Sequence, residues 1–514
     1  MLAWFAREAS VGTGEDPAKY ISLGRELLEF SYRDVDIAGE PLHSRYPPGY
    51  PAVLALASLV SRSLDWLHFV TIACSAAALG FFFASVARAW NARFALLVLA
   101  ALSVNQVMVG LAGEASAEAP FTMWLMIALW GTTRDTASAP WYTGVAGILA
   151  ALTRSAGVAV IPALVAYWIW RRQWRAALGF AVASILIVGA WQAYSWSAPE
   201  QYIGDSYAAD FVRGGEKPTD PGGASGLIVN VSRRVASNAK WYLVRGLPPR
   251  IPLPSIPGTP IDNAAHILIL LAGLGVGVFV IARRWPAAAA AIVFYAGLLA
   301  VWPWQVSRFL APMVPFLVLA VLTAAATIAA RFWVRSGARV ATALAAVIFV
   351  TGGVRTAEAI GRAAACDRSG GPTAAGCLSP EQDAYLRVVA YIRDSTARDA
   401  IVLSAKPASV HHFSGHQSVP HRAVTQLSAA EYLPFLRSRG VRYILLGTVH
   451  ATELIQFRRL IESNCSALTL RTVVAPYAYL FEVAGAPADG GAAACSAVAL
   501  HVRATQGYSF EVPR

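Results

Sequence analysis

The sequence predicts an all-α membrane domain that crosses the bilayer many times, followed by a small α/β domain. Hydrophobic residues make up 56% of the chain and charged residues only 14%, whereas soluble domains carry roughly 25% charged residues. Apolar segments long enough to cross a bilayer recur through the first two thirds of the chain. The last third returns to the composition of a soluble protein. We therefore expect one membrane domain and one globular domain.

Basic residues gather in the short loops between the apolar segments. The net charge is +12, and short loops rich in Lys and Arg stay on the cytoplasmic side of a membrane. The excess of basic residues therefore indicates which loops are cytoplasmic, and nucleic acid is not expected as a partner. The loop arginines are Arg88, Arg93, Arg171, Arg172, Arg175, Arg283, Arg284, Arg331, Arg335 and Arg339.

About ten membrane-crossing or half-crossing helices fit this pattern. The segments 141–153 and 155–170 are short for a crossing of ~30 Å, so we expect a hairpin of short helices that meets at Thr153 and Arg154. The predicted helices begin near residues 65, 94, 118, 141, 155, 176, 262, 287, 309 and 340.

Three segments follow from this topology. An extracytoplasmic N-terminal segment with a juxtamembrane helix covers 1–64, the transmembrane domain covers 65–357, and a soluble α/β domain covers 358–514. The first 15 residues hold neither a signal peptide nor a span, so we expect the natural protein to carry one more helix upstream. The loop 196–261 is rich in Gly and Pro, which favours an irregular extracytoplasmic loop able to cover a site.

The C-terminal domain shows short apolar runs that alternate with amphipathic ones. We expect buried strands at 399–405, 442–448 and 478–483, helices at 430–440 and 453–463, and a loop at 484–494. Four of the five cysteines lie here, whereas Cys74 lies in an apolar stretch. Disulfides are permitted if this domain is extracytoplasmic. Of the three connectivities that four cysteines allow, we predict the pairing of neighbours, Cys366–Cys377 and Cys465–Cys495.

Ionisable residues cluster at the predicted extracytoplasmic ends of the apolar segments, where a charge is costly unless it is used or paired. Two acids at a helix start can simply favour the helix dipole, and arginines can reach toward the interface. Arginines near one face also suit a phosphate, because guanidinium is a planar, bidentate donor. The clusters contain Glu15, Asp16, Lys19 and Tyr20; Arg45 and Tyr46; Glu114 and Glu118; Arg154; and Arg308.

Two other groups of residues receive ordinary interpretations. The histidines His411, His412, His416 and His421 have no local cysteine or carboxylate to complete a zinc site, so no metal site is predicted. The tryptophans of the apolar segments fit an interfacial belt, and stacking on carbohydrate is the alternative for Trp302 and Trp304.

Taken together and in this order, the motifs closely resemble those of the GT-C glycosyltransferases, nearest the protein mannosyltransferase and aminoarabinose transferase group. The resemblance covers residues 14–356, and the stretches 405–407 and 413–415 resemble the soluble domain of bacterial members. The motifs are Asp-x-Ala-x-Tyr at 16–20, Arg-Tyr-Pro-Pro-Gly-Tyr-Pro at 45–51, Glu-Ala-Pro-Phe at 118–121, Leu-Thr-Arg at 152–154 and Arg-Phe-Leu-x-Pro-x-x-Pro at 308–315.

This resemblance implies a membrane enzyme that moves a hexosyl or pentosyl group from a polyprenyl phosphate to an extracytoplasmic acceptor. Asp16 matches the acid of the first loop, which would be the catalytic loop, and Glu118 matches a second acidic position. The order Glu15-Asp16 departs from the family, so the resemblance leaves open which of the two is the base. Arg308, Arg45, Arg154 and Lys19 are assigned to the donor phosphate, and Tyr20, Tyr46 and Trp304 to the acceptor or the sugar.

The residue types fit this chemistry. A base takes the proton of the attacking acceptor, and fixed cations stabilise the phosphate that leaves. One acid with arginines suits direct inversion, whereas a glycosidase uses two cooperating carboxylates. No cofactor is certain, because some relatives of this fold need a divalent cation and others do not. The expected partners are a polyprenyl-phosphate sugar, membrane lipid and an unknown protein, lipid or glycan acceptor.

The expected location is a bacterial inner membrane, with the active site and the C-terminal domain on the periplasmic side. The alternative function is a transporter or flippase for a lipid-linked sugar, without transfer chemistry. Transporters often show two related halves and broken helices, and we find no such halving in the sequence. A non-catalytic assembly protein would leave the acids and arginines without a use.

Overall fold

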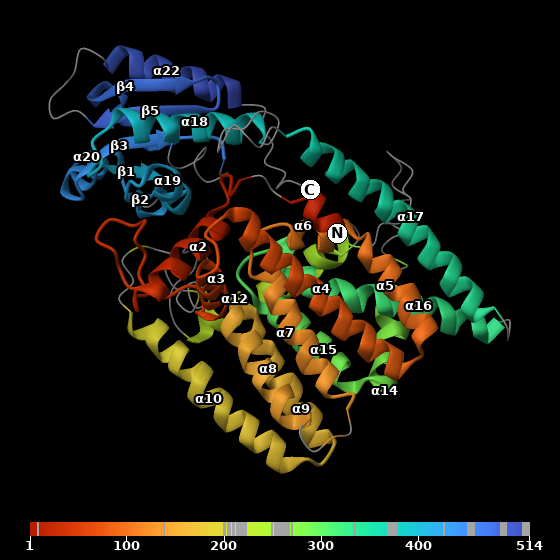
Figure 1. The fold of residues 1–514 in the computed structure, drawn as a ribbon. Helices are drawn as coiled ribbons and strands as arrows, with labels where there is room; N and C mark the ends of the chain where they lie inside the picture. The colour runs from red at the N-terminus through yellow and green to blue at the C-terminus, as the bar shows by residue number, and fades with distance from the viewer. Residues whose placement is uncertain are drawn as a thin grey trace. The chain divides into compact units, whose positions relative to one another are not determined.

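The computed structural model divides the 514-residue chain into two compact units, which we describe separately (Figure 1). The helical unit comprises Met1–Arg7, Ser44–Ser197 and Ser206–Ala364, and the sheet unit comprises Glu8–His43, Ala198–Asp205 and Ala365–Arg514. The structure describes residues 1–7, 10–134, 136, 139–198, 202, 207, 211, 224–247, 250, 268, 271–332, 336–366, 378–424, 427–449, 458–483 and 491–505.

The helical unit consists of helices whose starts agree closely with the sequence prediction. The prediction near 262 falls on 261–267, outside the described residues. The longer helices are α4 (Leu64–Ala89), α5 (Ala92–Ser103), α7 (Glu118–Gly131), α8 (Ala139–Thr153), α9 (Val160–Trp170), α10 (Trp174–Ser197), α12 (Ala224–Trp241), α15 (Pro286–Val301), α16 (Val314–Phe332) and α17 (Gly337–Ala364). The shorter ones are α1 (Leu2–Phe5), α3 (Gly49–Ser58), α6 (Gln106–Ala112), η1 (Ser155–Ala159), η2 (Tyr242–Gly246), η4 (Gly273–Gly277), α14 (Val278–Arg284) and η5 (Ser307–Met313).

Within the described residues, four helices are long and apolar enough to cross a membrane: α4, α10, Ser307–Phe332 and α17. The pair α5 and α6, bent by 66°, makes a fifth if it forms one span. The protein is therefore a membrane protein with several candidate spans. The predicted number of about ten crossing or half-crossing helices is not confirmed, because several of the predicted segments form shorter helices.

The predicted hairpin of short helices is confirmed. Helix α8 ends at Thr153, whose hydroxyl donates to the carbonyl of Leu149. Arg154 is extended at φ −151°, and the chain re-enters η1 and α9 directly after it. A close approach between Gly157 and the carbonyl of Ala150 makes this break compact. A Cβ on Gly157 would lie 2.3 Å from the oxygen of Ala150, so only glycine fits there.

The loop prediction for 196–261 is wrong over part of its length. The 18-residue helix α12 occupies Ala224–Trp241. Its stretch of sequence contains no proline, so nothing removes a backbone donor from the helix. The prediction gave too much weight to the prolines at 247–257, which lie outside the described residues except at Leu247 and Arg250.

The sheet unit contains a five-stranded mixed sheet in the order β2-β1-β3-β5-β4, coloured blue in Figure 1. Strands β2 (Ser418–Pro420), β1 (Ile401–Ser404) and β3 (Val441–Leu446) run parallel to one another. Strands β5 (Ala478–Val483) and β4 (Leu468–Val474) complete it in antiparallel pairs. The strands predicted for β1, β3 and β5 are confirmed, whereas β2 and β4 were not predicted.

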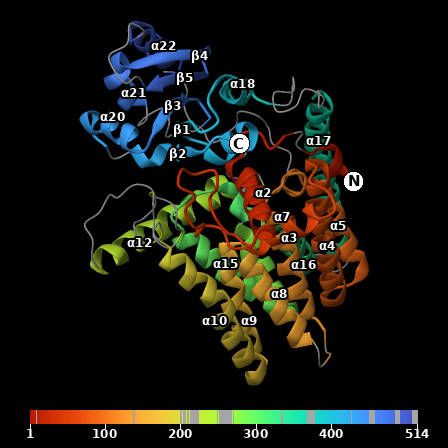
Figure 2. The ribbon, with the colours of Figure 1, turned by 60° about the vertical axis from the view of Figure 1, so that its left-hand side comes forward.

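Alternation along the strands builds three layers, visible in Figure 1 and Figure 2. Val402, Tyr443 and Leu480 pack on one face with α18 (Pro380–Ser395) and α19 (Pro407–Ser414). Their strand neighbours face the other side and pack against α20 (Ala429–Ser438), α21 (Arg458–Asn464) and α22 (Gly491–Thr505). Period-two alternation places successive side chains on opposite faces of a sheet, and both faces of this one are buried.

Within the predicted N-terminal segment, Glu8–His43 belongs to the sheet unit. After α2 (Glu15–Leu28), residues 36–38 pair with the edge strand β2. The amide of Ser418 donates to the carbonyl of Asp36, and the amide of Ala38 donates to the carbonyl of Ser418. An exposed strand edge offers unpaired donors and acceptors, so this segment completes the edge.

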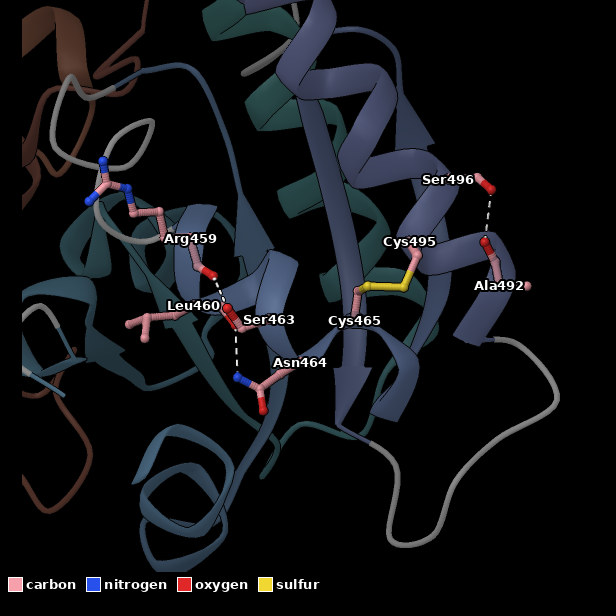
Figure 3. The surroundings of a disulfide bond; sticks show 8 residues. All are labelled: Arg459, Leu460, Ser463, Asn464, Cys465, Ala492, Cys495 and Ser496. Atoms are coloured by element: carbon pink, nitrogen blue, oxygen red, sulfur yellow. Dashed lines mark hydrogen bonds between the residues drawn. A yellow bond between two sulfur atoms is a disulfide. The ribbon is translucent and has the colours of Figure 1, made fainter. Parts of the chain in front are cut away.

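The disulfide Cys465–Cys495 is confirmed, and Figure 3 shows it between η9 (Cys465–Ala467) and α22. The other predicted pair, Cys366–Cys377, involves Cys377, which lies outside the described residues. The loop predicted over 484–494 is wrong from Gly491 onward, because α22 begins there. Alanine-rich sequence favours a helix, which explains the error.

Candidate functional site

The helical unit brings three of the predicted residues together around one carboxylate. Glu118 is the first residue of α7, and its side chain is 4% exposed. Its Oε1 atom forms an ion pair with Nη1 of Arg154 and lies 3.6 Å from Nε of Arg308. These residues lie up to 190 positions apart in the sequence, and the fold brings them together. In this triad, two guanidinium groups face one carboxylate.

Glycine at position 49 lets two of the sequence motifs meet. The start of α3 packs against the end of α8, and a Cβ on Gly49 would lie 2.6 Å from the carbonyl oxygen of Leu152. Only glycine permits such an approach. The Pro-Pro-Gly motif therefore lies directly beside Thr153 and Arg154, which explains physically why the two motifs belong to one arrangement.

Arg45 lies in an aromatic surround. Its guanidinium carbon is 4.7 Å from the ring centre of Tyr207 and 5.6 Å from that of Trp304. Tyr207 also contacts Tyr46, with ring centres 6.0 Å apart, and Trp302, at 5.6 Å. A cation over aromatic faces is stabilised by the ring quadrupoles. The contacts fix the direction of Arg45 and create a wall of rings.

This aromatic wall extends to the triad of Glu118, Arg154 and Arg308. Trp302 contacts Phe309 with ring centres 6.5 Å apart. The ring of Phe309 lies 5.0 Å from the guanidinium carbon of Arg154. A connected set of side chains therefore runs from Arg45 to Glu118 within the helical unit. Of the predicted site residues, Arg45, Tyr46, Glu118, Arg154, Trp304 and Arg308 belong to it.

Sequence reasoning missed Asn238, which holds this wall in place. Its buried amide nitrogen Nδ2 lies 3.0 Å from the carbonyl of Leu299, 3.0 Å from that of Ala300 and 2.7 Å from that of Trp302. Gln305 donates to Oδ1 of Asn238 at 3.1 Å. Asn238 therefore fixes the connection between α15 and η5, which carries Trp304 and leads into Arg308. An asparagine in a predicted loop gave no signal for this role.

The sheet unit holds the two neighbouring acids at the start of α2. The Oε1 atom of Glu15 accepts a hydrogen bond of 3.2 Å from the amide of Ala408, in the first turn of α19. Its Oε2 atom is buried and accepts no hydrogen bond from the described residues. Burial raises the pKa of Glu15 to about 7, although Lys19 and Lys406 lower it. Glu15 is thus tied to the Lys-Pro-Ala motif of the same unit.

Asp16 occupies the next position of α2 and is half-buried. Two acids in the first turn of a helix are favoured by the helix dipole. Tyr20, one turn further along, is buried. Successive helical residues point in directions about 100° apart, so the two carboxylates have different surroundings although they are adjacent in the chain.

Lys19 forms the centre of a buried ionic cluster. Its ammonium lies 2.8 Å from Oδ1 of Asp34 and 2.5 Å from Oδ1 of Asp36. Nδ1 of His43 lies 2.7 Å from the same oxygen of Asp34. Burial would raise the pKa of Asp34, but His43 and Lys19 outweigh it and hold that pKa well below its usual range. Both aspartates were missed, because acids in a polar segment read as solvent-exposed.

The histidines of the sheet unit form ordinary contacts. The Nε2 atom of His416 lies 3.0 Å from the hydroxyl of Thr396, and the His416 side chain is buried. Burial lowers the pKa of His412 to about 4, and Arg25 and His411 act in the same direction. No group of three or more metal-binding side chains gathers within the described part of the chain.

Sequence comparison leaves the chain without a match, because neither a family model nor a curated protein matches it. Solved structures do match. ArnT from Cupriavidus metallidurans bound to undecaprenyl phosphate has a TM-score of 0.56 at 13% identity, with 95% of this chain and 97% of that chain covered. The same protein in the apo state gives 0.55 at 12% identity, with 94% and 97% covered.

The oligosaccharyltransferase from Archaeoglobus fulgidus, in the apo form, gives a TM-score of 0.52 at 13% identity. The match covers 94% of this chain and 71% of that chain. ArnT and the oligosaccharyltransferase are both GT-C glycosyltransferases. At these identities the likeness establishes the fold, and it agrees with the resemblance found in the sequence motifs. The chain therefore has the fold of the GT-C glycosyltransferases.

Proposed function

We propose that this protein transfers a sugar from a polyprenyl-phosphate donor to an acceptor, with inversion at the anomeric carbon. The observation that carries the proposal is the triad of Glu118, Arg154 and Arg308 in a membrane protein with the GT-C fold. Charged residues inside an apolar unit indicate a functional site, and guanidinium groups suit a phosphate. The solved ArnT structure carries undecaprenyl phosphate.

In the proposed reaction, Asp16 acts as the base. It takes the proton from the acceptor hydroxyl or amine as that atom attacks the anomeric carbon of the sugar. The new bond to the acceptor forms while the bond between the anomeric carbon and the phosphate oxygen breaks. The electron pair leaves with the lipid phosphate, which departs with one more negative charge. No acid has to protonate this leaving group, since a phosphate is stable as an anion.

The arginines stabilise the charge that develops on the phosphate. We assign Arg308 and Arg154 to the departing phosphate, and Arg45 to the donor side behind the aromatic wall. Trp304, which contacts Arg45, and Tyr46, which contacts Tyr207, are assigned to the sugar, and Tyr20 to the acceptor. Glu118 keeps Arg154 and Arg308 oriented through its ion pairs. Fixed cations at a site of developing charge need no reorganisation during the reaction.

Glu15 and Lys19 receive supporting roles in the proposal. Glu15 caps α19 through Ala408, which ties the catalytic loop to the rest of the sheet unit. Lys19 fixes Asp34 and Asp36, its two partners in the structure, and we leave it out of donor binding. We therefore assign the role of base to Asp16.

We place the reaction on the extracytoplasmic side of a bacterial inner membrane, together with the sheet unit. The disulfide Cys465–Cys495 supports this side, because disulfides persist in oxidising compartments. The arginines of the loops around 88–93, 171–175 and 283–284 then lie on the cytoplasmic side, as the distribution of basic residues requires.

The test uses purified protein in proteoliposomes with a radiolabelled polyprenyl-phosphate sugar and a panel of lipid, peptide and glycan acceptors. We expect label to appear in a new product, and Arg308→Gln to reduce the rate by roughly 10²–10³-fold. The matched control is Arg283→Gln, an exposed arginine of the same unit. Movement of the labelled lipid between leaflets, with no product from any acceptor, would instead support the transporter.

A further inference from the structure

The helical unit contains a cavity of ≈ 770 Å³ that none of the proposed reaction residues line. It opens between the turn that follows α7 and the turn that joins α9 to α10. Four arginines and no carboxylate are among its described lining residues. The arginines are Arg134, Arg171, Arg172 and Arg175. A cavity of this size, within the ~300–1,000 Å³ of small-molecule sites, therefore carries a concentrated positive charge.

Two hydrogen bonds hold the turn that follows α7, one from α9 and one from Trp285. The hydroxyl of Tyr167 donates to the carbonyl of Thr132 at 3.0 Å, across 35 positions of sequence. The indole of Trp285 donates to the hydroxyl of Thr132 at 3.2 Å. Trp168, which also lines the cavity, is buried and packs edge-on against Phe180. The arginines therefore stand on a rigid frame.

A buried hydroxyl in the cavity wall has no protein partner. Thr143 is 1% exposed, and its Oγ1 atom forms no hydrogen bond with the described residues. A Cβ on Gly131 would lie 1.9 Å from this oxygen, so glycine is needed for α7 and α8 to approach there. An unsatisfied buried hydroxyl costs about 1–3 kcal/mol. A ligand oxygen in the cavity would accept a hydrogen bond from this hydroxyl and remove the cost.

The turn between α9 and α10 places the basic cavity at the level of the membrane interface. Trp170 and Trp174 flank the turn and are 64% and 60% exposed, as expected for aromatic residues at a bilayer surface. Arg172 has φ +58°, a left-handed conformation that costs a non-glycine residue roughly 1–2 kcal/mol. Arg172 therefore adopts a backbone conformation that favours glycine, and it lines the cavity.

We propose that this basic cavity binds the phosphate headgroup of an anionic membrane phospholipid. The guanidinium groups would hold the phosphate oxygens in bidentate pairs, and Thr143 would donate its hydroxyl. Basic pockets between helices on the cytoplasmic side bind anionic headgroups in this way. The exposed tryptophans beside the cavity favour a lipid over a soluble phosphate, because they place its mouth where headgroups lie.

The test measures lipid retained by the purified full-length protein. The protein is incubated in nanodiscs that contain phosphatidylglycerol and cardiolipin in phosphatidylcholine, transferred to detergent, and analysed by native mass spectrometry. We expect one tightly retained anionic phospholipid in the wild type. The double variant Arg172→Gln/Arg175→Gln should weaken its retention roughly 30-fold. The matched control Arg331→Gln/Arg339→Gln removes the same charge from exposed arginines that do not line the cavity, and should retain the lipid.

The variant Thr143→Val tests the cavity wall without changing the charge. It replaces an unpartnered buried hydroxyl by a methyl group of similar size, so the protein should fold with unchanged or higher thermal stability. We expect lipid retention to fall roughly 3- to 10-fold. Equal retention by the wild type and both double variants would overturn the proposal. Binding of inorganic phosphate or pyrophosphate by the cavity, without retained lipid, would overturn the assignment to a lipid.

Discussion

Glu118 and Arg154 form an ion pair inside the helical unit, with Arg308 as a second cation 3.6 Å from the same oxygen. The pair joins the first residue of α7 to the break between α8 and η1. Removal of one member of a buried pair leaves the other charge without compensation, which is more damaging than removal of both. We therefore expect the ion pair between Glu118 and Arg154 to contribute to the stability of the protein as well as to its function.

A double-mutant cycle on Glu118 and Arg154 tests this expected contribution to stability. Glu118→Gln should lower the free energy of unfolding by about 3–5 kcal/mol, because Arg154, whose side chain is 11% exposed, loses this carboxylate as a partner. Arg154→Gln should also destabilise the protein, and Glu118→Gln/Arg154→Gln should recover part of the loss. Denaturant titration in detergent micelles measures the cycle. Strictly additive effects would show that the two side chains do not interact.

The pKa of Glu15 predicts a pH dependence for the sheet unit. The folded protein holds this proton with a pKa of about 7, against an ordinary value of 4.5. Below pH 4.5 both the folded and the unfolded states are protonated, so the stabilisation is complete there. It is lost as the pH rises from 4.5 to 7, at a cost of about 3 kcal/mol. Glu15→Gln should therefore make the protein more stable above pH 7.

His412 acts in the opposite direction, so the wild type alone does not report on Glu15. Its pKa is lowered from 6.5 to about 4 by burial, and stability is lost as the pH falls from 6.5 to 4. The measurement is therefore the difference in melting temperature between Glu15→Gln and the wild type across pH 4.5–8. The control Glu29→Gln changes an exposed acid at the end of the same helix. A difference that does not vary with pH would contradict a raised pKa.

Asn238 should be a positioning residue of the reaction. Asn238→Ala removes the donor that holds Leu299, Ala300 and Trp302, with an expected loss of about 1–3 kcal/mol of stability and a lower rate of transfer. Asn238→Asp should be worse than Asn238→Ala, because a carboxylate would face three carbonyl oxygens. Unfolding and donor saturation curves report the two effects. The reverse order of the two variants would contradict this role.

The disulfide Cys465–Cys495 should stabilise the sheet unit. It closes a loop of 30 residues, for which loss of chain entropy in the unfolded state predicts about 3–4 kcal/mol. Cys465→Ser/Cys495→Ser should lower the stability by that amount and leave the helical unit unchanged. Thiol labelling of protein made in an oxidising and in a reducing compartment checks formation of the bond. Free thiols at both positions after export would contradict it.

The sequence predicted the helix starts of the helical unit well, because long apolar runs broken by arginine loops have few alternative structures in a membrane. It also predicted the break at Arg154, where a charge interrupts two short apolar runs. It missed α12, because the surrounding prolines dominated the interpretation of residues 196–261. It missed β2 because three residues carry too little pattern, and a strand of that length depends on its neighbours.

In the candidate site, the sequence singled out charged residues that interrupt apolar segments and missed buried residues that lie in polar segments. Glu118, Arg154 and Arg308 stood out because charges in apolar sequence are rare. Asn238, Asp34 and Asp36 lie in polar sequence, where nothing distinguishes a buried side chain from an exposed one. Their roles depend on contacts with residues distant in the chain, such as Trp302, and the order of residues contains no direct record of such contacts.

The measurement that tests the central claim most directly is the rate of sugar transfer by Asp16→Asn, with Glu15→Gln as its neighbour control. Both variants keep the size of the side chain, and a bound fluorescent polyprenyl phosphate reports donor affinity in the same samples. The account predicts that Asp16→Asn binds the donor normally but transfers the sugar roughly 10²–10⁴-fold more slowly, whereas Glu15→Gln retains most of the activity. Full activity in Asp16→Asn would contradict the account, and its loss in Glu15→Gln alone would identify Glu15 as the base.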